Sequence, residues 1–121
     1  MDLQVVNGSF SVCKVTDIDK ELISKEYTFI GKTDQELSLF CKTENVPKDV
    51  ITVEHGWRCF RIAEDASFEK YGMIAFLANI IAAEKTCTLV VGTYDTDYIF
   101  IKEDRFDDIT TALRQNGCRF L

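Results

Sequence analysis

The chain has 121 residues, a net charge of −6 and 46 % hydrophobic residues, which suits one small domain or two very small ones with a buried core. Acidic residues outnumber basic ones by 20 to 14. This excess argues against binding to nucleic acid or to an anionic membrane surface, because both attract clustered Lys and Arg. The sequence offers no bilayer-spanning stretch and no signal peptide, and its five scattered cysteines are typical of reduced, buried thiols in a cytoplasmic protein.

Runs of β-branched and aromatic residues bounded by turn residues predict strands along the chain. Expected strands of the first half are Phe10–Val15, Tyr27–Lys32, Leu37–Cys41 and Val50–Val53. Those of the second half are Trp57–Ile62, Thr88–Thr93, Tyr98–Lys102 and a short terminal strand, Cys118–Phe120. The turn-like sequence around His55 and Gly56, which predicts a surface turn at His55, separates the two halves.

Two helices are expected in the second half. The segment Gly72–Glu84 is apolar nearly all round, so it must be covered on more than one side, and a homodimer would do this. The C-terminal helix has Asp104 as a candidate N-cap and two further acids, Asp107 and Asp108, in its first turn. Asn116 and Gly117 supply its stop signal.

An internal repeat predicts how the chain is organised. Phe29–Leu37 aligns without gaps on Val90–Tyr98, and each copy is expected to form a strand, a tight acidic turn and a second strand. The order of elements in the second half is βαββαβ, which is ferredoxin-like. We therefore expect an α+β fold with two ferredoxin-like halves, residues 1–55 and 56–121. The segment Thr16–Glu26 has no apolar helix, so the first half is abbreviated, with a reduced or missing first helix.

Five segments together resemble small bacterial and fungal proteins with paired ACT-like domains, which are similar to the ACT domains of the CASTOR arginine-sensor family. The segments are Ser11–Lys14, Lys32–Leu39, Val46–Pro47, Gly56–Arg61 and Thr93–Ile99. The resemblance covers nearly the whole chain. It implies ACT-type halves that associate side by side, and a regulatory sensor module that binds an amino acid at a domain interface.

The resemblance also implies a site between the start of the apolar helix and the repeated turn of the second half. In the sensors, segments matching these two hold the ligand. The candidate ligand-binding residues are Tyr71, Gly72, Met73, Ile74, Thr93, Asp95, Thr96 and Asp97. A helix N-terminus attracts a carboxylate, and the acids of the turn attract an ammonium, so the two segments together suit an amino acid or similar small carboxylate. The sensors carry an acidic residue just inside the helix where this chain has Ala75, which argues against arginine.

Enzyme functions have little support in the sequence. The chain has no G-x-S-x-G elbow, P-loop or G-x-G-x-x-G motif, and no catalytic residue, metal or cofactor is expected. A single acidic turn offers too few oxygens for calcium. The alternative from another class is a structural or partner-binding ACT pair that has lost its ligand.

Overall fold

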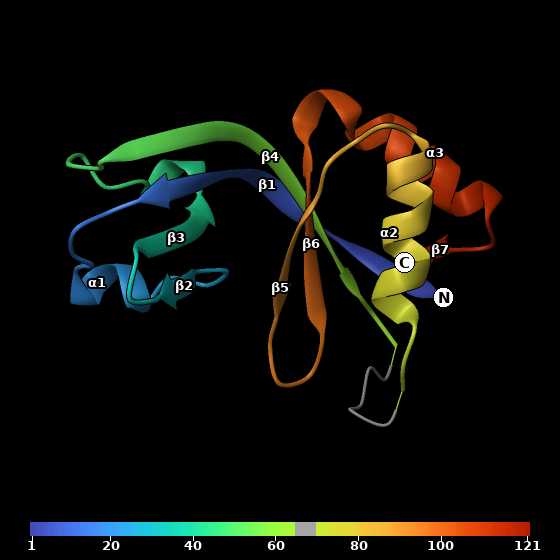
Figure 1. Ribbon diagram of the computed structural model, residues 1–121, viewed down its shortest axis with the longest axis horizontal. Coiled ribbons are helices and arrows are strands. Elements are labelled where there is room, and N and C mark those ends of the chain that lie inside the picture. The colour runs from blue at the N-terminus through green and yellow to red at the C-terminus, as the bar shows by residue number, and fades with distance from the viewer. Residues whose placement is uncertain (65–69) are drawn as a thin grey trace. The chain divides into compact units, whose positions relative to one another are not determined.

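The computed structural model describes residues 1–64 and 70–121, which contain seven β-strands and three α-helices (Figure 1). The contacts divide the chain into two compact parts. Unit 1 comprises Met1–Asn7 and Arg58–Leu121, and unit 2 comprises Gly8–Trp57. The mixed α and β content and the antiparallel pairing expected from the sequence are confirmed.

Unit 1 has the strand order β5–β6–β4–β1–β7, to which β1 contributes its first residues and β4 its last. Its elements are β1 (Asp2–Lys14), β4 (Thr52–Ile62), α2 (Met73–Ala83), β5 (Leu89–Gly92), β6 (Asp97–Lys102), the 3₁₀ turn η2 (Glu103–Arg105), α3 (Phe106–Gln115) and β7 (Arg119–Phe120). The terminal strand β7 runs parallel to β1, with Asp2 opposite Arg119. The two side chains also form an ion pair at 2.9 Å.

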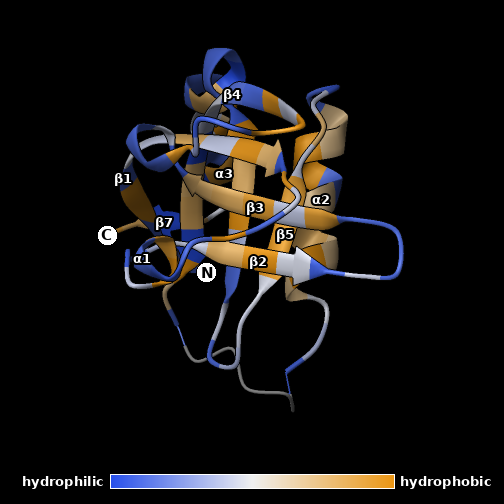
Figure 2. Ribbon diagram, turned by 90° about the vertical axis from the view of Figure 1, so that its left-hand side faces the viewer, coloured by the Kyte–Doolittle hydropathy of each residue, from blue (hydrophilic) through white to orange (hydrophobic). Residues whose placement is uncertain are grey.

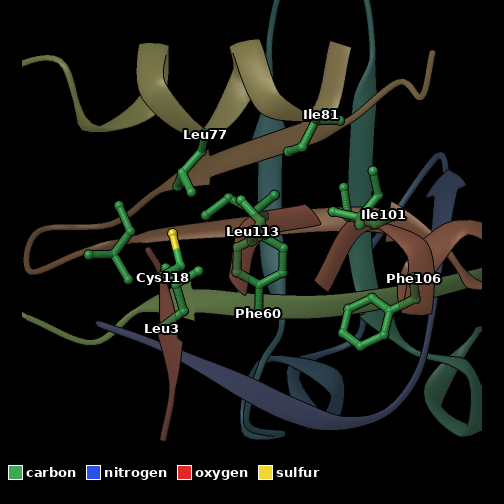
Figure 3. Close-up of a cluster of buried hydrophobic side chains, with 11 residues drawn as sticks. Leu3, Phe60, Leu77, Ile81, Ile101, Phe106, Leu113 and Cys118 are labelled. Atoms are coloured by element: carbon green, nitrogen blue, oxygen red, sulfur yellow. The ribbon is translucent and has the colours of Figure 1, made fainter. Parts of the chain in front are cut away.

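The core of unit 1 lies between its strands and its two helices. Leu77 and Ile81 extend from α2 towards Phe60 and Leu113 (Figure 3), and all four side chains are at most 1 % exposed. The Phe60 ring lies edge-on to Phe120, with centroids 5.7 Å apart. Burial of these side chains is the main stabilising contribution to unit 1.

Unit 2 has the strand order β2–β3–β1–β4, using the last residues of β1 and the first of β4. Its other elements are the four-residue helix α1 (Lys20–Ile23), β2 (Phe29–Lys32), β3 (Leu37–Lys42) and the 3₁₀ turn η1 (Thr43–Asn45). Hydrophobic colours run along β3, and hydrophilic colours mark the loop joining it to β2 (Figure 2). The core of unit 2 contains Cys13, Leu22, Leu39 and Cys41.

The strands β1 and β4 are longer than the sequence predicts, because each one continues through a glycine. Gly8 has a φ of +104° within β1, and Gly56 has a φ of +84° within β4. Glycine tolerates this left-handed backbone, so each strand continues past it. His55 is therefore a strand residue, not a turn residue, and its Nδ1 lies 2.7 Å from the Oγ of buried Ser11. The division expected at residue 55 places residues 1–7 in the first half. The contacts group these residues with unit 1.

The two hairpins of the internal repeat close in the same way, but their equivalent residues differ by one position from those paired in the sequence alignment. The backbone N–H of Thr33 donates to the carbonyl of Glu36 at 2.9 Å, and that of Thr93 donates to the carbonyl of Thr96 at 2.8 Å. These bonds match Thr33 with Thr93, whereas the sequence alignment matched Gly31 with Gly92. The sequence alignment is set by the shared glycine and acids. In the structure the threonine closes each turn, so the threonines are the equivalent residues.

The expected helix Gly72–Glu84 is observed as α2, with the two end residues as its caps. The expected N-cap of the last helix is wrong, because Asp104 lies in η2 and α3 begins at Phe106. Asp107 and Asp108 do occupy the first turn of α3. No helix in the described ranges is long and apolar enough to cross a membrane.

Thiol chemistry gives a first expected result. Cys87 is exposed, whereas the other four cysteines are buried. Burial raises the pKa of the Cys41 and Cys59 thiols to about 12 and also raises the pKa values of Cys13 and Cys118. Because the thiolate is the reactive form, a disulfide reagent at pH 8 should modify one thiol quickly in the native protein and all five in denaturant. The fast phase should disappear in Cys87→Ser. A second fast thiol would contradict the buried positions.

Candidate functional site

The first candidate segment is the start of α2. Gly72 caps the helix with a φ of +83°, and the space where a Cβ would lie is open within 4 Å. The cap provides no side-chain hydrogen bond to the first turn. Tyr71 is 94 % exposed beside it. The arrangement leaves backbone N–H groups and the positive end of the helix dipole accessible.

The next two candidate residues have mainly structural side chains. Met73 and Ile74 are partly buried and pack against the core of unit 1. What they can offer a ligand is therefore the backbone N–H at the helix start, rather than the side chain.

The second candidate segment is the turn between β5 and β6. The Thr93 hydroxyl donates to the carbonyl of Thr96 at 3.0 Å. The Thr96 hydroxyl in turn donates to the carbonyl of Ile62 at 2.7 Å. Both hydroxyl protons are thus used within the fold, and each hydroxyl oxygen can still accept a hydrogen bond from a ligand.

The carboxylates of this turn differ in their surroundings. Asp95 is exposed, whereas Asp97 is half-buried and pairs across the hairpin with Gly92. One carboxylate oxygen of Asp97 lies 3.1 Å from the position that a Cβ on Gly92 would take. The absence of a side chain at residue 92 therefore gives the Asp97 carboxylate its space. Asp97 is the more fixed of the two groups that could accept an ammonium.

Both candidate segments lie at one end of unit 1. The bond between Thr96 and Ile62 ties the turn to the end of β4, and α2 begins shortly after that strand. Figure 1 shows the first turn of α2 and the β5–β6 turn at the same end. The described residues also contain no group of three or more His, Cys, Asp or Glu suited to a metal ion.

A cavity of about 710 Å³ lies elsewhere, in unit 2, beside α1. Sequence reasoning did not identify it. The signal that could have indicated it is Pro47, which comes shortly after the 3₁₀ turn η1. In unit 1 the corresponding turn, η2, continues directly into the helix α3.

A family model described as "ACT domain" matches residues 52–115, which is more than half of the chain and includes both candidate segments. No curated protein matches the sequence significantly. Among solved structures, protein Atu0741 from Agobacterium tumefaciens is similar at 24 % identity with a TM-score of 0.89, covering 99 % of this chain and 91 % of that one.

Two further solved structures share the fold. The Vibrio cholerae protein VC0802 is 18 % identical with a TM-score of 0.72, covering 92 % of this chain and 85 % of its own. The ligand-free regulatory subunit of aspartate kinase from Thermus thermophilus is 7 % identical with a TM-score of 0.67, covering 93 % and 95 % of the two chains. At these sequence identities the structural similarity shows a shared fold and nothing about function.

Proposed function

Because the chain belongs to the ACT domain family, we propose that it is a regulatory module that binds an amino acid and has no catalytic activity of its own. The observation that carries the proposal is the family match over residues 52–115, which spans β4 to α3. The similarity to a regulatory subunit of aspartate kinase supports a regulatory role. Its five free cysteines suit a reducing compartment, which supports a cytoplasmic location.

The proposed site lies between the start of α2 and the Thr93–Asp97 turn. The carboxylate of the ligand would accept hydrogen bonds from the N–H groups after Gly72, where the helix dipole favours negative charge. The ammonium would lie against Asp97, with Asp95 nearby and the oxygens of Thr93 and Thr96 as further acceptors. This opposed polarity suits a zwitterion.

We also propose that the two units are ACT-like halves of ferredoxin-like type, as in the CASTOR-related proteins. The support is the correspondence of the two hairpins and of the 3₁₀ turns that follow them, η1 and η2. In this interpretation the first half is abbreviated, because α1 has four residues where α2 has eleven.

Replacing the Asp97 carboxylate should weaken the amino-acid ligand. We expect Asp97→Ala to cost about 1.5–3 kcal/mol of binding free energy, the typical value of a charge-assisted hydrogen bond, measured by calorimetric titration. Asp97→Asn should lose nearly as much, because it keeps the shape and removes the charge. Asp104→Asn, which removes an exposed acid of η2, is the matched control and should bind like the parent.

Equal affinity of the parent and both Asp97 variants would contradict this site. A Gly72 variant is a poorer test, because any side chain at a φ of +83° strains the backbone as well as obstructing the ligand.

We further propose that the chain forms a homodimer that covers part of α2. Only Leu77 and Ile81 of this apolar helix are buried, and Phe76 is 39 % exposed. Sedimentation at tens of micromolar, roughly where weak dimers form, should show a dimer. Phe76→Glu should shift it towards monomer, and Gln115→Glu, at an exposed polar position of α3, should not. A strict monomer of the parent would contradict this assembly.

A further inference from the structure

Two buried thiols of unit 2 lie on neighbouring strands and on the same face of the sheet. In the β1–β3 pairing, Cys13 lies opposite Leu39, and Cys41 lies opposite Ser11. Because side chains two residues apart on a strand share a face, Cys13 and Cys41 occupy diagonal positions of the two strands. They are 2 % and 0 % exposed, and both belong to the core cluster of unit 2. The pair is therefore built by one strand pairing within one compact part of the chain.

The surroundings of the two thiols are apolar. Val15, Leu22 and Leu39 are the other buried members of the cluster. Burial raises the pKa of Cys41 to about 12, with a further contribution from the neighbouring Cys13 thiol, and burial also raises the pKa of Cys13. Both thiols are thus protonated at neutral pH, and a ligand that binds thiolates must displace their protons.

The diagonal arrangement favours a bridging ion over a disulfide. Diagonal positions of neighbouring antiparallel strands have Cα atoms about 7–8 Å apart, whereas the Cα atoms of disulfide-bonded cysteines usually lie within about 6.8 Å of each other. A disulfide would therefore require the two strands to move closer. A metal–thiolate bond is about 2.3 Å long, so a linear sulfur–metal–sulfur unit spans roughly 4.6 Å and can bridge the side chains with the strands in place.

The number of available ligands selects the kind of metal. Within residues 1–64 and 70–121, no group of three or more His, Cys, Asp or Glu is suited to a metal ion. The pair thus offers two thiolates without a third such ligand from that part of the chain. A structural zinc ion takes four ligands, so the pair does not suit zinc. Cu(I) is a soft ion that prefers sulfur ligands and accepts linear coordination by two of them.

An entry path to the pair runs beside α1. Leu22 is buried in the same cluster as the thiols, and it also lines the cavity beside α1. The helix α1 has only four residues, and a helix this short has little stability of its own. Opening of this single turn gives an ion access to the cluster while β1 and β3 stay paired.

We propose that Cys13 and Cys41 form a binding site for Cu(I), which is held by their two thiolates. Binding forms two copper–sulfur bonds and releases the two thiol protons to solvent, and neither copper nor sulfur changes its oxidation state. The site goes beyond the function proposed for unit 1 and is independent of the amino-acid site there.

The experiment is an anaerobic competition for Cu(I) between the protein and the chelator bathocuproine disulfonate. Because Cys87 is exposed and would bind copper by itself, the reference protein is Cys87→Ser, and it should withhold one copper ion per chain. In this protein Cys13→Ala and Cys41→Ala should each weaken binding by about a hundredfold or more, above the usual loss for an outer-shell partner. Cys118→Ala, which removes a buried thiol of unit 1, is the matched control and should bind like the reference.

X-ray absorption of the copper-loaded reference protein tests the ligands without relying on the folding of the alanine variants. Two sulfur ligands are expected, with no nitrogen or oxygen ligand. The proposal is overturned if the reference protein withholds no copper, if nitrogen or oxygen ligands are found, or if Cys13→Ala binds as tightly as the reference. A Cys13–Cys41 disulfide in the copper-treated protein, detected by mass spectrometry without reduction, would also overturn it and would identify the pair as redox-active instead.

Discussion

Phe60→Ala is expected to destabilise the protein by about 3–5 kcal/mol, the range for removing a buried aromatic side chain. Phe60 is 0 % exposed in the core of unit 1. Its ring lies 6.5 Å from Phe106 and 5.7 Å from Phe120, centroid to centroid. Alanine would leave a cavity beneath both helices of this unit. Urea unfolding followed by circular dichroism measures the loss.

The matched control is Val90→Ala, because Val90 is 42 % exposed on β5. Its side chain buries less area, so the loss should be smaller, about 1 kcal/mol. Cys118 belongs to the same core as Phe60, and its thiol should react faster in Phe60→Ala than in the parent. A loss below about 1 kcal/mol for Phe60→Ala, less than core substitutions typically cause, would contradict the core of unit 1.

Leu39→Ala is expected to cost about 2–5 kcal/mol, the range for truncating a buried leucine, because Leu39 is 0 % exposed in the core of unit 2. Two thiols of that core, Cys13 and Cys41, pack in the same cluster. Their reaction with a disulfide reagent should accelerate more than that of Cys118, which belongs to the core of unit 1. Mass spectrometry of the labelled peptides resolves the individual cysteines.

The control for Leu39→Ala is Ile30→Ala. Ile30 lies directly opposite Leu39 in the β2–β3 pairing and is 44 % exposed, so its truncation should cost much less. Equal acceleration at Cys13, Cys41 and Cys118 would contradict a separate core in unit 2.

The elements of the second half could be predicted from sequence because their signals are local. The apolar run of α2 ends at residues with cap geometry, and the acids of α3 mark its first turn. The sequence patterns predict no strand in the first seven residues, whereas β1 begins at Asp2 and continues through Gly8. A φ of +104° inside a strand becomes apparent only when the neighbouring strands are in place.

The candidate site was predictable in its residue types but not in their bonding. The acids and threonines of the Thr93–Asp97 turn are evident in the sequence. That Thr96 donates to the carbonyl of Ile62 depends on contact between distant segments. Likewise Pro47 is visible in the sequence, but the cavity beside α1 is not. It becomes apparent only when η1, which no helix follows, is compared with η2, which continues into α3.

The most direct test of ligand binding is a thermal-shift screen of the parent protein against the common L-amino acids. A ligand that binds the folded chain raises its apparent stability, by about 2.7 kcal/mol at a concentration one hundred times its dissociation constant. We expect at least one amino acid to raise the melting temperature, and Asp97→Asn to reduce that rise while Asp104→Asn leaves it unchanged. No rise with any amino acid at millimolar concentration would contradict the proposed function and favour a structural or partner-binding role.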